Sequence, residues 1–435
     1  MIQHLLAVAL LLPCLSHAWS CPHGKDEHSK SLFSADDAMP WTQNMTLKEG
    51  LRDRPGVVPN RHQVNLDLPP AERWVEIGKI YANRSDEIVQ YFEEMLPHAA
   101  VVAIDKIAKH LVDYKGFKEG GFSDEMRGYS EGLGLDLGYV VAANMVYQLE
   151  SIGVNCSNWN NTGPTGQCEG EDPVDEVTWY ESNHYLKTQE DGVNAGFCTS
   201  VVTNNARGTI LHGRNLDWNL DEALREFIID VDFMRGGELL YTGSTIVSFV
   251  GVLNAMKPGE NGFSFSMDAR CQGGKLWANL LEALALGGME PSQHSRTVME
   301  AAGSFDEAVH LFETGKLLDD GYFIVGGART GEGAVVTRAR NHNVDTWKID
   351  ASDEEHGWYR LETNYDHFDD APSADDRRTP GFENMEGVGL DAVDQDNLKA
   401  DVMTQWPTYN EHTDLTCIME AATGLYDCTV WMDEV

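Results

Sequence analysis

The stretch NAGFCTSVVTNNARGTILHGRNLD, residues 194–217, predicts two β-strands joined by a short turn. β-branched and apolar residues lie on both sides of residues 204–208, whose asparagines and glycine favour a hairpin turn. A turn centred on Ala206 places Cys198 opposite Arg214 in an antiparallel pair. A thiol then faces a guanidinium across the two strands.

This pairing has a chemical and a structural interpretation. A permanent cation beside Cys198 favours the thiolate and lowers the pKa of the thiol. Asp217, further along the second strand, could orient Arg214 or accept a proton. The alternative is a buried structural cysteine beside an ordinary ion pair, and spacing alone does not decide between the two.

The chain before residue 198 is predicted to be largely helical. Apolar residues follow a helical spacing over residues 74–96 and again over residues 101–111. Residues 155–175 are rich in Asn, Gly, Thr and acidic side chains, which indicates an exposed loop.

From residue 198 onward, short β-branched and aromatic runs predict a series of strands, so the fold class is α+β. The predicted strands are residues 199–203, 209–212, 227–233, 245–253, 262–267, 322–325, 334–337, 344–349 and 358–363. Helices are predicted over residues 276–286 and 304–312, the latter with Ser304 as N-cap and Glu307 in a capping box. Residues 367–382 read as a loop.

The composition is globular but strongly acidic. Asp and Glu number 70 against 32 Lys and Arg, so the net charge is −38, while 42% of the residues are hydrophobic. Such a negative field repels phosphate backbones, so no nucleic-acid partner is expected. Acidic pH would relieve part of the repulsion because carboxylates become protonated. The composition therefore fits an acidic compartment.

The N-terminus and four sequons indicate the secretory pathway. Residues 1–18 combine a short apolar run with small residues near Ala18, as in a signal peptide. No later segment has the roughly 18 apolar residues of a membrane span. We expect a lysosomal or secreted glycoprotein. Its glycan acceptors would be Asn44, Asn83, Asn155 and Asn160.

The cysteine count is odd once the signal peptide is removed, because Cys14 leaves with it and seven of the eight cysteines remain. At least one thiol is then free or bonded to another molecule. The local pairs Cys156–Cys168 and Cys417–Cys428 are candidate disulfides, although spacing does not fix the connectivity.

Several other active-site motifs are missing from the sequence. It contains no GxxxxGK[ST] phosphate loop, HExxH zinc helix or GxSxG nucleophile elbow. The histidines are scattered, so we expect no metal site. The glycine-rich residues 326–333 lie between two predicted strands and read as a hairpin connection, not a dinucleotide site.

The stretch around Cys198 occurs in one order with four further blocks: residues 66–74 with the sequence LDLPP, residues 322–333, residues 363–366 and residues 375–380. Together they resemble the family of acid ceramidase and N-acylethanolamine-hydrolysing acid amidase, which are N-terminal-nucleophile hydrolases. The LDLPP block makes acid ceramidase the nearer branch.

The resemblance implies a four-layer αββα sandwich built from two pieces of one precursor. Residues 1–18 are the signal peptide, residues 19–197 a largely helical light chain, and residues 198–435 a sheet-rich heavy chain.

The resemblance also implies a mechanism. Autocleavage between Phe197 and Cys198 would make Cys198 an N-terminus, with its thiol as nucleophile and its α-amine as general base. The side-chain amide of Asn364 would stabilise the oxyanion that forms on the substrate. The catalytic residues carried over from the family are Cys198, Arg214, Asp217, Asn364 and Arg377.

The same residues also allow structural roles. Asn364 could end a strand, Arg377 could be solvated in an acidic loop, and Asp217 could cap a turn. Ala269 stands where the family has a glutamate, and Asp268 could supply the missing contact to the substrate. A secreted lipid-binding protein that lost catalysis is therefore kept as an alternative.

The predicted function is hydrolysis of ceramide to sphingosine and a fatty acid by an autocatalytically activated cysteine amidase. Hydrolysis of N-acylethanolamines to fatty acid and ethanolamine is the alternative, since it uses the same catalytic residues. Residues 245–253 and the light-chain helices are expected to contact the acyl chain. The lipid amide would arrive from a lipid-presenting helper protein or from a membrane surface at acidic pH. No cofactor is required, because the protein itself supplies nucleophile and base.

Overall fold

The computed structural model of the chain describes residues 54–95, 109–145, 197–218, 220, 222–270, 288–353, 356–371 and 375–433. Several predicted features lie outside these residues: the signal peptide, the loop at 155–175, the helix at 276–286, the Cys156–Cys168 pair, and Asn44, Asn155 and Asn160. Asn83 is the one predicted glycan acceptor inside them, and it is exposed. No helix in the described ranges has the length and apolar character needed to cross a membrane.

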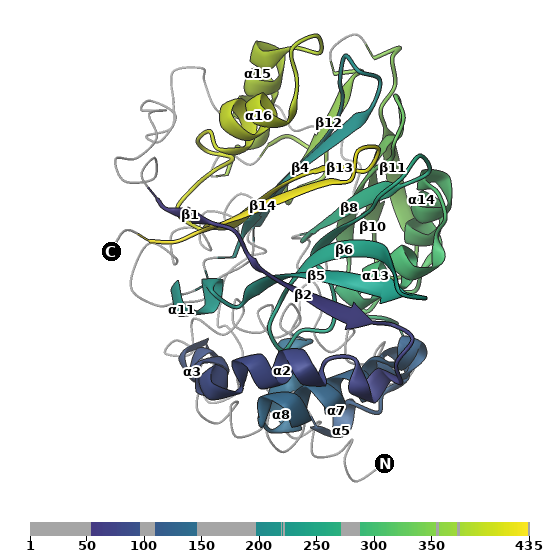
Figure 1. Cartoon of the computed structure of the whole chain (residues 1–435). Coiled ribbons are helices and arrows are strands. Elements are labelled where there is room, and N and C mark those ends of the chain that lie inside the picture. The colour runs from purple at the N-terminus through teal and green to yellow at the C-terminus, as the bar shows by residue number, and fades with distance from the viewer. Residues whose placement is uncertain are drawn as a thin grey trace, which may run out of the picture.

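Two β-sheets dominate the fold (Figure 1). The six-stranded sheet is antiparallel, and its order is β1 (Gly56–Val57), β14 (Leu425–Trp431), β13 (Thr413–Glu420), β4 (Ile210–Asp217), β3 (Phe197–Asn204) and β12 (Tyr359–Glu362). The eight-stranded sheet has the order β11 (Asn343–Lys348), β10 (Gly333–Arg338), β9 (Gly321–Gly326), β8 (Phe263–Asp268), β7 (Asn254–Lys257), β6 (Glu238–Ile246), β5 (Ile228–Arg235) and β2 (Asn60–Asn65). Its one parallel pair is β2 with β5.

The sheets pack face to face through β3 and β4 on one side and β8, β9 and β10 on the other. Apolar side chains such as Val202, Ile210 and Ile324 fill part of the space between them. Burial of such side chains out of water is the main stabilising contribution to this contact.

Helices lie against both sheets (Figure 1). The helices α13 (Pro291–Ala301) and α14 (Phe305–Thr314) contact the eight-stranded sheet. On the six-stranded sheet lie α15 (Arg378–Val388) and the helical turns α16 (Gln395–Asn397) and Leu398–Met403. The predicted α+β class is therefore confirmed.

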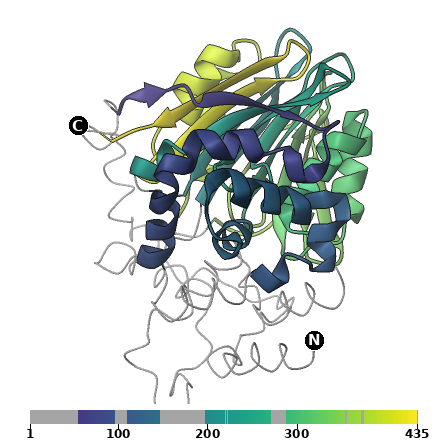
Figure 2. The same cartoon turned by 60° about the horizontal axis from the view of Figure 1, so that its bottom comes forward.

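Most of the described residues before 146 form a group of helices, seen in front of the sheets in Figure 2. They are α2 (Val75–Tyr81), α3 (Ser85–Met95), α5 (Lys109–Leu111), α6 (Lys115–Lys118), α7 (Phe122–Leu133) and α8 (Leu137–Ala143). The same part of the chain also supplies β1 and β2, which extend one edge of each sheet. The sequence missed β2, because residues 60–65 are mostly polar and exposed and show no alternating pattern.

A buried ion-pair cluster joins these helices to the rest of the fold. The Glu125 carboxylate of α7 accepts hydrogen bonds from Trp74 Nε1 at 2.6 Å, Arg73 Nη1 at 2.8 Å and Arg296 Nη1 at 2.5 Å. Arg296 belongs to α13, and its guanidinium and the carboxylate are both fully buried. A buried charge needs partners of this kind, so the two parts of the chain are tied together at this point.

The strand predictions were mostly confirmed, but residues 245–253 are not a strand. β6 ends at Ile246, and Ser248 then adopts a left-handed conformation with φ of 78°. Thr245 Oγ1 donates to the carbonyls of Phe249 and Gly251, which stabilises the resulting loop. A run of apolar residues was mistaken for a strand because the side chains of a buried loop are apolar too.

The start of α14 agrees with the prediction, whereas the start of α15 does not. α14 begins after Ser304, whose side chain accepts from Glu307 N at 3.3 Å as predicted, while the Glu307 carboxylate accepts from Gly303 N. The predicted loop at 367–382 is wrong in its last part, because α15 starts at Arg378.

Candidate active site at the start of strand β3

The β3–β4 hairpin carries Cys198, but its register differs from the prediction. Cys198 lies opposite Leu216, and Arg214 lies opposite Ser200. The loop comprises residues 205–209 and is centred one residue later than predicted. The Asn205 side chain sets this loop by accepting hydrogen bonds from the amides at 207 and 209.

The thiol and the guanidinium nevertheless meet. The register error moved the partner by two residues, and side chains two residues apart point to the same face of a strand. Arg214 Nη2 lies 3.5 Å from Cys198 Sγ and also donates to the carbonyl of Met267 at 3.0 Å. Arg214 Nη1 donates to Asn254 Oδ1 at 3.3 Å. The fully buried guanidinium is thus held by two further acceptors.

The predicted lowering of the Cys198 pKa is wrong for the uncut chain. Burial raises the pKa of the thiol to about 12, although the Arg214 guanidinium acts in the opposite direction. Removal of a group from water disfavours its charged form, and here that effect exceeds the attraction of the cation. Cys198 is therefore protonated at neutral pH in this form of the chain.

Asn364, just after β12, contacts the backbone nitrogen of Cys198. Asn364 Oδ1 accepts from Cys198 N and from Arg377 Nη2, each at 2.8 Å. Its Nδ2 donates to the Ala269 carbonyl at 2.7 Å. The side chain thus faces the nitrogen that cleavage would convert into an amine, and its assignment to the oxyanion stays a prediction.

Arg377 immediately precedes α15 and is buried, with 3% of its surface exposed, so it is not a solvated loop residue. Its Nη1 donates to the Cys198 carbonyl at 2.5 Å. Its Nε and Nη2 bind the Asp375 carboxylate at 2.8 and 2.7 Å. These contacts fix the guanidinium against the backbone at the start of β3.

Asp217 ends β4 and lies opposite Phe197. Its carboxylate accepts from Thr413 Oγ1 at 2.7 Å and lies 3.6 Å from Arg377 Nη1. Burial raises the pKa of Asp217 to about 6, with Arg377 acting in the opposite direction. The side chain is enclosed in the protein and lies beside Arg377, the second arginine of the site, whereas one prediction placed it beside Arg214.

The buried Asp268 at the end of β8 also belongs to this site. The sequence indicated it only as a possible contact to the substrate. Asp268 Oδ1 accepts from Ser200 Oγ at 3.0 Å and lies 4.0 Å from Arg214 Nε. Its Oδ2 has no hydrogen-bond partner among the described residues. Burial raises the pKa of Asp268 to about 7. Ser200 in turn accepts from Ser266, a contact that spacing along the chain could not reveal.

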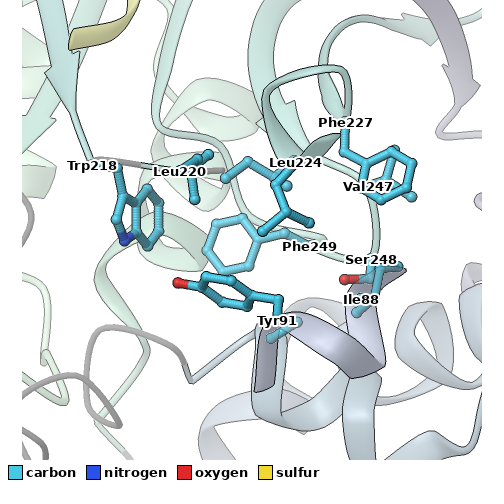
Figure 3. A pocket seen from close by; sticks show the side chains of 11 residues that line it. Ile88, Tyr91, Trp218, Leu220, Leu224, Phe227, Val247, Ser248 and Phe249 are labelled. Atoms are coloured by element: carbon cyan, nitrogen blue, oxygen red, sulfur yellow. The ribbon is translucent and has the colours of Figure 1, made fainter. Parts of the chain in front are cut away.

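An apolar pocket opens between the helices before residue 146 and the chain after Asp217 (Figure 3). Its lining comprises Ile88, Tyr91, Ala143, Trp218, Leu220, Leu224, Phe227, Ile246, Val247, Ser248 and Phe249. Trp218 directly follows Asp217, which is the cross-strand partner of Phe197. The pocket therefore begins near the end of the hairpin that carries Cys198.

The cysteines of the described ranges fall into two states. Cys417 and Cys428 form a disulfide between directly opposed positions of β13 and β14, as the sequence suggested. Cys198 is the free thiol. No cluster of three or more His, Cys, Asp or Glu side chains in these ranges is arranged to bind a metal.

Comparison with known proteins identifies the family of the chain. Residues 58–117 match the family model described as the beta subunit of N-acylethanolamine-hydrolyzing acid amidase. The N-acylethanolamine-hydrolyzing acid amidase of Cavia porcellus is 31% identical, over 84% of this chain and 88% of its own length. Acid ceramidase of Mus musculus is 28% identical, over 90% of this chain and 92% of its own length. The chain belongs to the family of these two enzymes.

A solved structure of the Caenorhabditis elegans ortholog of N-acylethanolamine-hydrolyzing acid amidase is also similar. The two sequences are 32% identical, and the match covers 51% of this chain and 92% of the ortholog's chain. The TM-score is 0.46. Membership of the acid ceramidase and acid amidase family makes the chain an amide-hydrolysing enzyme. The identities are too alike to place it nearer to the ceramidase branch.

Proposed function

We propose that this family member is a cysteine amidase that activates itself by cleavage before Cys198 and then hydrolyses a fatty-acyl amide. One observation carries the proposal. Each reactive group of Cys198 is held by a different predicted residue: Sγ by Arg214, N by Asn364 and the carbonyl by Arg377. Buried backbone groups need partners in any residue, but here the partners are the asparagine and the arginine that the resemblance assigns to catalysis, and a second arginine lies at the thiol.

Self-cleavage requires the thiol to attack the peptide carbonyl of Phe197. The C–S bond forms as the C–N bond to Cys198 breaks, the thiol proton passes to the departing nitrogen, and water then hydrolyses the thioester. The contact from Cys198 N to Asn364 Oδ1 orients that nitrogen in the uncut chain. The products would be a light chain of residues 19–197 and a heavy chain of residues 198–435.

After cleavage, the new α-amine can take the thiol proton, which makes Cys198 both nucleophile and base. A model α-amine titrates at about 7.7 to 8.0. The neighbouring guanidinium of Arg377 would lower that pKa, because a nearby cation disfavours a second positive charge. Asn364 Oδ1 would accept from the amine, and its second Nδ2 proton would be available to the oxyanion.

The apolar pocket supports a fatty-acyl chain as the acid portion of the substrate. Its lining combines residues of the proposed light chain, such as Ile88, with the loop that contains Phe249. Part of the stretch 245–253, which was predicted to contact the acyl chain, therefore lines this apolar pocket. The LDLPP block was the basis for preferring ceramide. It lies inside residues 58–117, which match the acid amidase model, so it does not distinguish ceramide from N-acylethanolamine as the substrate.

The remaining family properties are part of the same proposal. We place the two sheets and their helices in the αββα arrangement of N-terminal-nucleophile hydrolases. The precursor would enter the secretory pathway, carry glycans on its sequons, and act in lysosomes or outside the cell. The lipid would be presented by a helper protein or a membrane surface at acidic pH.

The test is N-terminal sequencing of the secreted protein before and after incubation at mildly acidic pH, with Cys198→Ala alongside. We expect a new chain that begins Cys-Thr-Ser in the wild type and an intact chain in the variant. Fatty-acid release from ceramide and from an N-acylethanolamine is then compared by mass spectrometry. A wild type that binds both lipids but cleaves neither them nor itself would instead be a lipid carrier.

A further inference from the structure

The space between the two sheets contains a polar layer beside the nucleophile. On the six-stranded sheet, four directly opposed residues form one row across β14, β13, β4 and β3, namely Cys428, Cys417, Arg214 and Ser200. On the eight-stranded sheet, the facing row across β5, β6, β7 and β8 is Asp230, Ser244, Asn254 and Ser266. All eight residues are buried.

Hydrogen bonds and close polar contacts join the two rows. Ser266 Oγ donates to Ser200 Oγ at 2.8 Å, and Arg214 Nη1 donates to Asn254 Oδ1 at 3.3 Å. Asn254 Nδ2 lies 3.5 Å from Cys417 Sγ. Ser244 Oγ lies 3.5 Å from the sulfur of Cys428.

Asn254 is the centre of this layer. Its carbonyl oxygen holds Arg214, while its Nδ2 donates to Tyr426 Oη at 2.8 Å and to Ser244 Oγ at 3.3 Å. Tyr426 belongs to β14, and Ser244 donates onward to Asp230 at 2.7 Å. The amide therefore has its orientation fixed by donors and acceptors on both sides, which leaves Oδ1 directed at the guanidinium.

We infer that Asn254, held in place by the Cys417–Cys428 disulfide and Tyr426, is a positioning residue for Arg214 and through it for the Cys198 thiol. The disulfide joins β13 to β14 next to the strand that carries Arg214, so it restrains the sulfur and the hydroxyl that Asn254 contacts. The inference rests on the proposed function, in which Cys198 is the nucleophile.

The physical reason is the distance dependence of the interaction between the guanidinium and the sulfur. Arg214 opposes the effect of burial on the thiol, and its closest nitrogen is 3.5 Å from Sγ. Without Asn254 the guanidinium would lose the acceptor on Nη1 and could rotate away from the sulfur. Weakening the charge interaction by such a shift raises the thiolate midpoint by roughly half a unit to one unit.

The experiment compares four variants of the processed enzyme: Asn254→Ala, Tyr426→Phe, the double variant Cys417→Ala/Cys428→Ala, and Val430→Ala as control. Val430 is buried in the same strand and the same apolar cluster as Cys428, and its side chain has no polar atom that could join the hydrogen bonds of the layer. The readouts are the pH dependence of Cys198 alkylation by iodoacetamide, kcat and KM for a fatty-acyl amide, and the thermal midpoint.

For Asn254→Ala we expect an alkylation midpoint higher by roughly half a unit to one unit and a kcat about tenfold lower, with KM within about twofold. Tyr426→Phe and the double cysteine variant should shift the midpoint in the same direction by less. Val430→Ala should lower the thermal midpoint and leave the alkylation profile in place.

An alkylation profile of all three network variants that coincides with the Val430→Ala control would overturn the inference. Tyr426→Phe removes a single oxygen atom, so it keeps the test informative if Asn254→Ala does not fold. Wild-type protein without amide turnover would refute the proposed function instead, while the alkylation comparison would still report whether Asn254 controls the thiol.

Discussion

Glu362 provides a direct test of how burial of acidic groups links stability to pH. This residue ends β12, is fully buried, and accepts one hydrogen bond through Oε1 from Thr363 N at 3.0 Å. Its Oε2 has no hydrogen-bond partner among the described residues. Burial raises the pKa of Glu362 from 4.5 to about 8, with Arg378 acting in the opposite direction.

The sign follows from proton linkage. A carboxyl with a raised pKa keeps its proton in the folded state, so its contribution to stability is complete below pH 4.5 and is lost as the pH rises toward 8. Between pH 4.5 and pH 7.5 the unfolded chain releases this proton and the folded chain retains it. At about 1.4 kcal/mol per pH unit, and with half of the unfolded carboxyls already ionised at pH 4.5, the loss in the free energy of unfolding is roughly 3.5 kcal/mol.

The Glu362→Gln variant removes this titration and keeps an acceptor for Thr363 N. We expect urea unfolding to show near wild-type stability at pH 4.5, and a free energy of unfolding at pH 7.5 that exceeds the wild-type value by roughly 3.5 kcal/mol. Glu260→Gln, in an exposed turn, is the matched control and should change neither value. Equal wild-type stability at both pH values, or an unchanged pH dependence in the variant, would refute the reasoning.

Three further changes test other parts of the structure. Glu125→Gln should lower the free energy of unfolding by up to about 3 kcal/mol, because it removes the buried carboxylate that Arg296 binds and leaves that arginine with Glu300 as its remaining acidic partner, and it should release the light chain of the processed enzyme at lower urea in gel filtration. Ala143→Leu should reduce hydrolysis of long-chain amides more than that of short-chain amides in a kinetic comparison, because it fills part of the apolar pocket. Ser248→Gly should raise the free energy of unfolding by up to about 1 kcal/mol in urea titrations, because it relieves a left-handed backbone conformation at φ of 78°.

The hairpin shows how far local sequence reasoning extends. The asparagines and glycine of residues 204–208 identified the turn, and the side-chain period of a strand placed Cys198 and Arg214 on one face despite the register error. The error arose because the Asn205 side chain closes a five-residue loop, a detail of hydrogen bonding that composition does not reveal. Local pattern therefore determined the face of the strand but not the pairing.

The direction in which the protein shifts the pKa of the Cys198 thiol could not be predicted from the sequence. A cation near Cys198 could be predicted, but full burial could not, because it depends on two sheets closing over the site. The same holds for the polar layer. Ser200 lies in the six-stranded sheet, whereas Asn254 and Ser266 are opposed to each other in β7 and β8 of the eight-stranded sheet, so only the packing of the two sheets brings the three together.

In the proposed mechanism, the contacts of Cys198 would make catalysis depend on cleavage. In the uncut chain the backbone nitrogen of Cys198 is a peptide N–H that donates to Asn364. It therefore has no lone pair with which to take the thiol proton. Burial at the same time holds the thiol pKa near 12. Cleavage after Phe197 would replace that peptide nitrogen by an amine with a lone pair. It would also create a new chain end at Phe197. The barrier to thiolate formation would then fall without movement of Arg214, because the base arrives in the position that the peptide nitrogen already occupies. The buried carboxyl of Asp268, with its pKa raised to about 7 by burial, contributes stability that is complete at acidic pH and is lost as the pH rises through 7.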